Sequence, residues 1–242
     1  MKQKGNYGLD SPAIVASLFG LGCILLLVGL TAHSGWRWVA YGFAVYFLFG
    51  AGGMLFYSKV GKLGLRERLL DKIPWRGDEK ILDIGCGRGL LTVGAAHRLS
   101  TGTATGVDVW NRHAISGNSA DSVLENAAIE GVKDRVEVTE GDARKLPFAD
   151  GTFDVVVSNF VVHDLKSRAD REQMMREAAR VLKSGGRVVL VDFIFTDDCV
   201  ADLRKFGAEA ERFREGGSLS FWISAILNFG AVKTYQVVGR KI

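Results

Sequence analysis

The sequence predicts an α/β domain with a mostly parallel sheet, preceded by a transmembrane helical hairpin. Three observations support this fold class: two uncharged apolar segments near the N-terminus, short apolar strands that alternate with helical segments from residue 80 onward, and a glycine-rich turn after the first strand. Strands that alternate with helices favour a parallel sheet, because parallel neighbours need a crossover connection. We therefore divide the chain of 242 residues into a hairpin (1–58), a juxtamembrane helix or linker (59–79) and an α/β domain (80–242).

Each N-terminal apolar segment is long enough to cross a lipid bilayer. Residues 13–31 and 38–57 are runs of 19 and 20 residues without a charged side chain, and Arg37 is the single charge between residues 13 and 58. A helix of about 20 apolar residues spans the ~30 Å hydrocarbon core. Two alternatives remain: a buried hairpin of a soluble protein, and a signal peptide followed by one anchor. The length of the first segment and the lack of a small-residue cleavage site disfavour the signal peptide.

Basic residues around the hairpin predict its orientation. They are Lys2 and Lys4 before the first segment, and Lys59, Lys62, Arg66 and Arg68 after the second. The positive-inside rule places both termini and the α/β domain in the cytoplasm. The four bases after the second segment either contact an anionic lipid surface or only set the topology.

Charge and cysteine content exclude some partners. The net formal charge is +4, and residues 59–242 hold 28 basic against 26 acidic side chains, which is no footprint of a nucleic-acid-binding domain. Cys23, Cys86 and Cys199 are scattered, so the spacing indicates neither a metal site nor a disulfide framework.

Residues 80–91, KILDIGCGRGLL, combine an apolar strand, an acid and three glycines ahead of a helix expected at 90–99. Glycine adopts positive φ and lets a ligand approach the backbone, while a helix N-terminus offers free N–H groups. The turn therefore predicts a nucleotide-binding corner. A dinucleotide-binding loop needs G-x-G-x-x-G, but the third glycine would fall at Leu90 or Thr92, which disfavours a nicotinamide cofactor. The acid is Asp83, and the glycines are Gly85, Gly87 and Gly89.

The elements after this turn continue the alternation of strand and helix. The second strand, 101–109, ends in Asp108, which lies 21 residues after Gly87 and near the ~20-residue offset of a carboxylate that binds ribose hydroxyls. Strand 153–159 is apolar, as expected for a strand covered on both faces. We also expect strands at 135–139, 187–193 and 232–239, and helices at 119–129, 172–182, 201–215 and 218–228.

The succession LDIGCGRG, GVDV, EGDARKLPFADGTFDVVVSN and EAARVLKSGGRVVLVDF resembles the small-molecule and lipid branch of the class I S-adenosylmethionine (SAM)-dependent methyltransferases. The resemblance covers residues 65–195 well and 196–242 loosely. It implies a Rossmann-like sheet with the last strand antiparallel, SAM as methyl donor, S-adenosylhomocysteine as product and a small-molecule or lipid acceptor. One strand that the family usually has after Phe195 is short or missing in the expected series.

The resemblance also assigns residues to the cofactor. Asp83 would organise the amino-acid end of SAM, although it could instead act as a helix cap. Asp108 would accept hydrogen bonds from the ribose hydroxyls, Val109 would pack on adenine, and Asp142 would accept from the adenine amino group. The complete expected cofactor-binding set is Asp83, Gly85, Cys86, Gly87, Gly89, Asp108, Val109, Asp142, Ala143 and Ser158.

His163 and Asn159 are the expected catalytic residues. Ser158 and Asn159 end a strand at the edge where open α/β sheets bind ligands. A histidine has a pKa near neutral pH, so His163 suits proton removal from an acceptor, or else it packs against the next helix. Positioning alone can supply much of the rate of methyl transfer, so a base is not required.

The segment 110–119, WNRHAISGNS, is longer and more polar than its counterpart in the family. Arg112, His113, Asn118 and Ser119 either close over the cofactor and acceptor or form a surface loop.

The sequence as a whole predicts a membrane-anchored, SAM-dependent methyltransferase of a small or lipophilic acceptor. The alternatives are a methyltransferase of a protein or soluble metabolite whose anchor only localises it, and a non-catalytic SAM-binding membrane module. The acceptor atom and the oligomeric state stay open.

Overall fold

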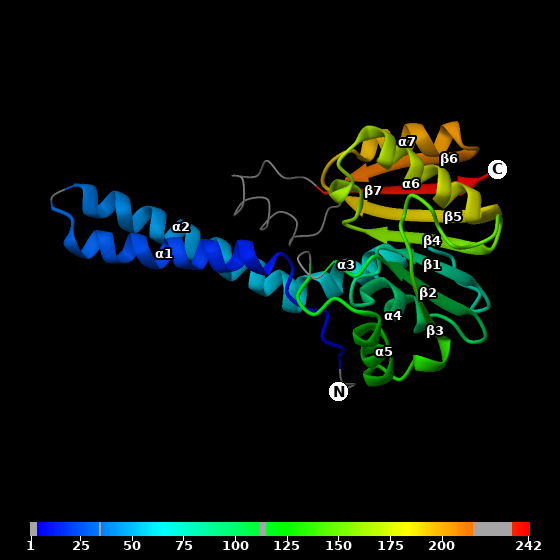
Figure 1. Ribbon diagram of the computed structural model, residues 1–242, viewed down its shortest axis with the longest axis horizontal. Coiled ribbons are helices and arrows are strands. Elements are labelled where there is room, and N and C mark those ends of the chain that lie inside the picture. The colour runs from blue at the N-terminus through cyan, green and yellow to red at the C-terminus, as the bar shows by residue number, and fades with distance from the viewer. Residues whose placement is uncertain (1–3, 34, 112–114, 215–233) are drawn as a thin grey trace.

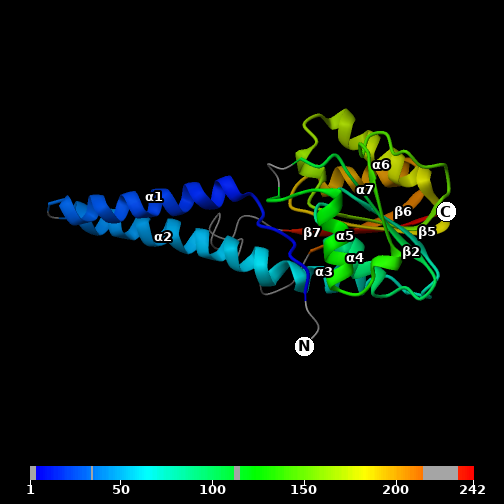
Figure 2. The ribbon, with the colours of Figure 1, turned by 60° about the horizontal axis from the view of Figure 1, so that its bottom comes forward.

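The computed structural model describes residues 4–33, 35–111, 115–214 and 234–242. Figure 1 shows a long helical hairpin that projects from one side of an α/β domain, and Figure 2 shows the same arrangement from another direction. A short N-terminal segment, residues 4–11, lies against the α/β domain before the hairpin begins.

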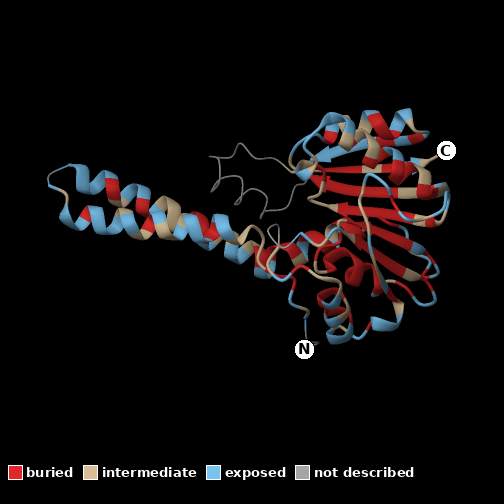
Figure 3. Cartoon of the chain, viewed as in Figure 1, coloured by how far each residue is buried: buried red, intermediate tan, exposed pale blue. Residues whose placement is uncertain are grey.

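Helices α1 (Pro12–Thr31) and α2 (Trp36–Phe56) form the hairpin. Small residues let them pack closely: a Cβ on Gly22 would lie 2.7 Å from Leu48, and one on Gly29 would overlap Tyr41. The outward faces are apolar and exposed, as Figure 3 shows by its blue colour. Both helices are long and apolar enough to cross a membrane, a judgement of length and composition alone.

Helix α2 continues without interruption into the α/β domain. A π-helical turn, η1 (Tyr57–Gly61), joins it to α3 (Lys62–Leu70). Leu65, Leu69 and Leu70 of α3 are buried in the core of the domain. The linker expected at 59–79 is therefore largely a core helix, and two of its bases, Lys62 and Arg66, are buried and not free to contact lipid or solvent.

The domain has one seven-stranded sheet in the order β3-β2-β1-β4-β5-β7-β6. Strand β7 runs antiparallel to both neighbours, β5 and β6, and the pairs among β1 to β5 are parallel, which confirms the expected arrangement. The strands are β1 (Lys80–Ile84), β2 (Thr103–Asp108), β3 (Val136–Glu140), β4 (Phe153–Asn159), β5 (Leu182–Asp192), β6 (Ala208–Arg214) and β7 (Tyr235–Lys241). The remaining helices are α4 (Leu90–Ala96), α5 (Ala120–Ile129), η2 (Lys133–Arg135), η3 (Val162–Asp164), α6 (Arg168–Val181) and α7 (Thr196–Lys205).

Apolar side chains fill both faces of the sheet. In β1, Ile81 packs with α3, α4 and α5, whereas its neighbours Leu82 and Ile84 pack with α6 and α7. This alternation follows from the two-residue period of a strand. The buried strands appear as red arrows in the centre of Figure 3.

The prediction of a helix at 201–215 is wrong for the second half of this range. Helix α7 ends at Lys205, and Gly207 follows at a φ of +84°, which a glycine tolerates after a helix end. From Ala208 to Glu211 buried alanines alternate with exposed glutamates, a two-residue period that forms β6. The strand that seemed short or missing is thus present. The helix expected at 218–228 and the start of the strand expected at 232–239 lie outside the described residues.

Candidate active site

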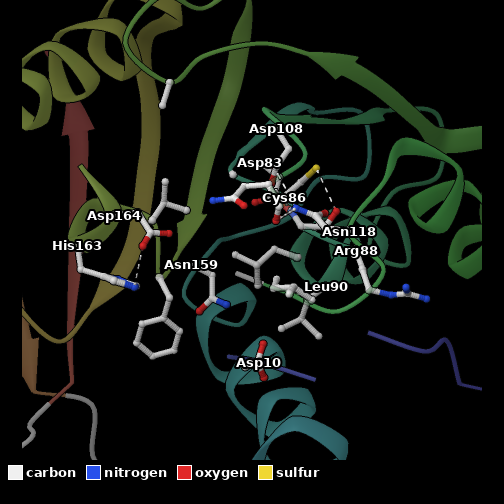
Figure 4. Close-up of a pocket in the computed structure, with 18 of the residues that line it drawn as sticks. Asp10, Asp83, Cys86, Arg88, Leu90, Asp108, Asn118, Asn159, His163 and Asp164 are labelled. Atoms are coloured by element: carbon white, nitrogen blue, oxygen red, sulfur yellow. Dashed lines mark hydrogen bonds and ion pairs between the residues drawn. The ribbon is translucent and has the colours of Figure 1, made fainter. Parts of the chain in front are cut away.

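A cavity of about 790 Å³ opens at the carboxyl ends of β1, β2 and β4. This is the edge at which open α/β sheets bind ligands, and the volume lies in the usual range for small-molecule sites. Figure 4 shows the side chains that line it: Asp83 and Asp108 come from strand ends, and Asn159 and His163 come from the β4 side. Arg88 of the glycine-rich turn also lines it, but its guanidinium points away, toward Asn6.

Two of the three glycines of the turn line this cavity. The backbone N–H groups of Gly85 and Cys86 donate to the Val107 carbonyl at 2.8 and 3.1 Å, which ties the turn to β2. Gly85 has a φ of +69°, and a Cβ there would overlap Val161. Gly87 has a φ of +56°. Side chains at these two positions would therefore be both strained and obstructed.

Gly89, the third glycine of the turn, does not line the cavity. It precedes α4 at a φ of +82°, and a Cβ on it would lie 2.6 Å from Val123 of α5. Its role is to start α4 and to let α4 pack closely on α5. Cys86, in contrast, lines the cavity and is buried, and burial raises the pKa of its thiol.

Asp108, the last residue of β2, binds the glycine-rich turn through its carboxylate. Its Oδ2 accepts from Gly87 N at 2.8 Å, and its Oδ1 accepts from Trp110 N at 2.7 Å and from Asn118 Nδ2 at 3.4 Å. Each carboxylate oxygen has two lone pairs, so Asp108 keeps acceptor capacity toward the cavity. The position fits the expected contact with ribose hydroxyls.

Asn118 comes from the long polar segment at 110–119. It is buried, lines the cavity and leaves its Oδ1 without a hydrogen-bond partner among the described residues. Ser119 instead caps α5 by accepting from Ser122 N. Arg112 and His113 lie outside the described residues. At Asn118, therefore, the segment is part of the site and not a surface loop.

Asp83 is fully buried beside the same turn. Its Oδ2 accepts from the backbone N and from the hydroxyl of Thr92, at 2.9 and 2.7 Å. Burial, with a smaller contribution from the nearby charge of Asp108, raises the pKa of Asp83 to about 7, against the hydrogen bonds from Thr92. Asp83 thus caps the first turn of α4, as the alternative interpretation proposed, while it also lines the cavity.

The expected adenine contacts lie together on one wall. Val109 and Ala143 line the cavity, and Val109 is 59% exposed. The carboxylate of Asp142 is bound by Arg144, at 2.6 Å from Nη2 and 3.0 Å from Nε, and Arg144 also reaches Asp170 at 3.0 Å. The hydrogen bond from Arg144 holds the pKa of Asp142 below its usual value. The sequence interpretation did not include Arg144, although it follows GDA directly.

Ser158 lies behind the cavity and not in its wall. Its side chain is buried in the sheet and donates to the Ile84 carbonyl at 2.9 Å. Asn159, the next residue, lines the cavity. The Oδ1 atom of Asn159 is buried and has no hydrogen-bond partner within the described part of the chain, so a ligand group can be its donor.

His163 is oriented by a buried carboxylate that sequence reasoning missed. Its Nδ1 lies 3.2 Å from both carboxylate oxygens of Asp192, the last residue of β5. The pKa of His163 is raised above 6.5. Burial alone would lower this pKa, but the hydrogen bond to Asp192 and the charges of Asp192 and Asp164 outweigh the effect of burial. An acid at the carboxyl end of an apolar strand, as in RVVLVDF, was the available signal for Asp192.

The N-terminal segment supplies a further wall that the sequence did not reveal. The Asn6 carbonyl accepts from Arg88 Nε at 2.7 Å, and Leu9 exchanges hydrogen bonds with Ser116. Tyr7 and Asp10 line the cavity. These contacts hold residues 4–11 across the glycine-rich turn and the 115–118 segment.

The residues of this site fit SAM. The cradle at Gly85 and Gly87 would be filled by any Cβ, and Asp108 presents a carboxylate to the same space. Asn118 and Asn159 add buried carbonyl oxygens that lack partners among the described residues. Such acceptors suit the hydroxyl and ammonium groups of SAM.

Known proteins are similar in sequence to the part of the chain that forms this site. Residues 82–190 match a family model described as a methyltransferase domain. The 27-O-demethylrifamycin SV methyltransferase of Amycolatopsis mediterranei is 36% identical over 156 residues, which cover 63% of this chain and 51% of the relative. The ubiquinone/menaquinone biosynthesis C-methyltransferase of Roseobacter denitrificans is 30% identical over 128 residues, 53% of this chain and 48% of the relative. The chain spans about half the length of the curated relatives it matches.

Solved structures share the fold. The YcgJ protein of Bacillus subtilis has a TM-score of 0.56 at 19% identity and covers 75% of this chain and 98% of its own. Geranyl diphosphate C-methyltransferase of Streptomyces coelicolor, solved with geranyl diphosphate and S-adenosyl-L-homocysteine, has a TM-score of 0.58 at 16% identity and covers 74% of this chain and 78% of its own. These structures share the fold of this chain, and the sequence match to a methyltransferase domain covers residues 82–190.

Proposed function

We propose that this chain is a membrane-anchored methyltransferase that moves a methyl group from SAM to a small, lipophilic acceptor and releases S-adenosylhomocysteine. One observation carries the proposal: a single cavity is lined both by the glycine-rich turn and Asp108 and by residues at the base of the apolar hairpin. An enzyme built in this way brings a soluble cofactor and a membrane-dissolved acceptor to one place.

The chain's own residues have separable tasks in this reaction. SAM, when bound, supplies a methyl group on a sulfonium, which is a good leaving group. Asp108 and the turn at Gly85 and Gly87 position the cofactor, and positioning is a large part of the rate enhancement. His163 accepts a proton from an acceptor O–H or N–H through Nε2, because Asp192 holds the proton of the ring on Nδ1.

The exposed faces of the hairpin support membrane insertion. Large apolar side chains such as Phe19, Leu27 and Phe49 are more than half exposed along both helices. A soluble monomer rarely leaves so continuous an apolar surface in water. Trp36 and Trp38 stand at the turn, where aromatic rings favour the membrane interface. With the basic residues on the other side, both termini and the catalytic domain face the cytoplasm.

Names of relatives support a small-molecule acceptor, and some of them name lipophilic ones. Those quoted above refer to a rifamycin and to ubiquinone or menaquinone, and a further relative is a sterol 4-C-methyltransferase of Caenorhabditis elegans, 33% identical over 134 residues. Acceptors of this kind are small, largely apolar molecules, and the apolar side chains in the cavity wall, such as Leu65, Leu90 and Phe193, suit them.

The full chain in detergent, supplied with methyl-labelled SAM, tests the proposal. Total lipid extract, a soluble metabolite fraction and membrane protein are offered in parallel, and the label in each is counted. Label in an organic-extractable product is the expected result. Label in protein or in soluble product would reduce the hairpin to a localising anchor. SAM binding without label in any fraction would contradict the catalytic assignment and favour a non-catalytic SAM-binding module.

A further inference from the structure

The cavity extends from the glycine-rich turn to the base of the hairpin. Residues before position 70 form a whole side of its wall, although the methyltransferase match begins at residue 82. They are Tyr7, Asp10, Ser11, Met54, Tyr57, Ser58, Lys62, Leu65 and Arg68. Figure 4 shows Asp10 facing Leu90 of the domain across this part of the cavity. The hairpin base is thus built into the site.

The wall residues of the long helix lie on one stripe. Positions 54, 58, 62 and 65 recur at spacings of three and four residues, and 57 and 68 lie three residues from 54 and 65, which places these side chains along one side of the helix. The same helix runs from the exposed apolar hairpin to the core of the domain, from Trp36 to Leu70. Leu55 and Phe56, next to Met54 in sequence, are exposed and do not line the cavity. One face therefore leads from the apolar span directly into the site.

A π-helical turn stands where this helix enters the cavity. Tyr57 and Ser58 begin η1, and both line the wall. Turns of this kind inside α-helices occur often at functional sites, because they change the direction of side chains locally. Here the turn separates the apolar span from α3, which packs into the domain.

Buried polar contacts fix this wall in place. The Nζ of Lys62 donates to the carbonyls of Tyr7 and Gly8 at 2.7 and 3.0 Å and lies 3.1 Å from Asp10 Oδ2. Ser58 Oγ donates to Asp10 Oδ2 at 2.8 Å. Because these bonds pin the start of α1 to η1 and α3, the wall is preorganised for a ligand and pays little ordering entropy on binding.

The two ends of the cavity differ in chemistry. Asn159 and His163 line the sheet end, whereas Met54, Tyr57 and Leu65 place apolar side chains at the hairpin end, beside the ion pair of Lys62 and Asp10. Methionine is flexible and adapts to tails of different shape. An acceptor that reaches from His163 to Met54 therefore needs a polar head and an apolar tail.

We infer that the acceptor is an amphiphile with a hydroxyl-bearing head at His163 and an apolar tail bound along the stripe of Met54, Tyr57 and Leu65, entering from the bilayer. The inference rests on the proposed function and names its substrate class. Met54 and Leu65 are then specificity-determining residues, and the hairpin is a part of the acceptor site.

A photoreactive phenol with a dodecyl tail, which carries a diazirine near the tail end, tests this with the full chain in phosphatidylcholine bilayers. Labelled residues are mapped by mass spectrometry with S-adenosylhomocysteine present. We expect labelling of Met54 and its stripe that an excess of unlabelled 4-dodecylphenol removes. Labelling of Phe19 and Phe49, which face outward, should resist competition. Equal, uncompeted labelling of the stripe and the outward faces would overturn the inference.

Matched variants sharpen the result. Met54→Trp should lower competed labelling at least about tenfold, because a tail displaced by two methylenes loses roughly that affinity. Leu55→Trp, one residue away and outside the wall, should leave it unchanged. Met54→Ala, which cannot block the tail, should retain labelling. Equal effects of Met54→Trp and Leu55→Trp would contradict the assignment.

The two proposals fail separately. Specific labelling of the stripe without methyl transfer to any acceptor fraction would support the amphiphile site and contradict the proposed methyltransferase activity. Label transfer from SAM into organic product without competed labelling of the stripe would support the activity and contradict the assignment of the hairpin to the acceptor site. SAM binding by each variant checks that the domain is folded.

Discussion

The Nδ1 atom of His163 lies 3.2 Å from both carboxylate oxygens of Asp192, which is fully buried at the end of β5. Backbone N–H groups of His163 and Phe193 also donate to this carboxylate, at 3.2 and 2.7 Å. The ring of His163 packs on Phe193 with centroids 4.5 Å apart. The histidine therefore has a fixed orientation before any ligand binds, which a proton acceptor requires.

Asp192→Asn should shift the pH dependence of methyl transfer. The base acts in its neutral form, so activity rises as pH increases through the pKa of His163. Asp192 raises this pKa, and its neutral replacement should move the rise to lower pH. The turnover should fall by about 10²-fold, the usual contribution of a general base. The pH–rate profile of wild type and variant measures both effects; a fall in rate with an unmoved profile would indicate a structural role only.

Asp108→Ala should weaken SAM binding about 10- to 100-fold, because a charged hydrogen-bond acceptor contributes about 1.5–3 kcal/mol. The variant also frees Gly87 N from its 2.8 Å hydrogen bond and so loosens the turn. Equilibrium dialysis with labelled SAM gives the affinity. Asp121→Ala, an exposed acid in the first turn of α5, is the control and should bind like wild type. Unchanged affinity of Asp108→Ala would refute the ribose assignment.

Gly85→Ala should abolish SAM binding, because the added Cβ overlaps Val161 in a backbone conformation at φ +69°. Gly131 is a matched control, with a φ of +73° and open space around its Cα. Gly131→Ala should cost about 1–2 kcal/mol of stability through the left-handed conformation alone and leave SAM affinity unchanged. Thermal melts with and without SAM separate the two effects. Equal SAM affinity in both variants would show that the turn does not hold the cofactor.

Asp83→Asn should change how stability depends on pH. The pKa of Asp83 is raised from 3.8 to about 7 in the folded chain, so the folded state binds more protons than the unfolded state between these values. Its contribution to the stability is present at low pH and is lost as pH rises through about 7. The melting temperature of wild type, relative to the variant, should fall over this range. A constant difference between the two melting curves would show that Asp83 is not protonated at neutral pH.

The orientation of the hairpin can be measured with single cysteines. His33→Cys lies at the exposed turn between α1 and α2, and Asp71→Cys lies at the exposed end of α3. In intact cells an impermeant maleimide should label the first and not the second, since the positive-inside rule places the domain in the cytoplasm. After cell lysis both should react. Labelling of Asp71→Cys in intact cells would reverse the topology, and resistance of His33→Cys would contradict membrane crossing.

Sequence patterns predicted the fold correctly where the pattern lies within one continuous segment of the chain. The turn at Gly85 and Gly87 and the offset to Asp108 were readable, because strand, turn and helix follow one another in the chain. Strand β6 was missed because its charged residues suggested a helix, and only the buried Ala208 and Ala210 show the two-residue period.

Contacts between segments that are distant in the chain could not be predicted from the sequence. Asp192 meets His163 across 29 residues, and Lys62 meets Tyr7 across 55, so no local pattern contains them. The sequence also does not separate Ser158 from Asn159: successive strand residues point to opposite faces, and only Asn159 of the two lines the cavity.

The most direct test is methyl transfer by the full chain reconstituted in liposomes made with total lipid extract. Wild type and Asp108→Ala are supplied with methyl-labelled SAM from the outside, and label in the organic phase is followed with time. We expect label to accumulate with wild type and to be reduced at least about tenfold with Asp108→Ala at subsaturating SAM. No organic label with wild type that binds SAM, or equal label with both proteins, would contradict the account.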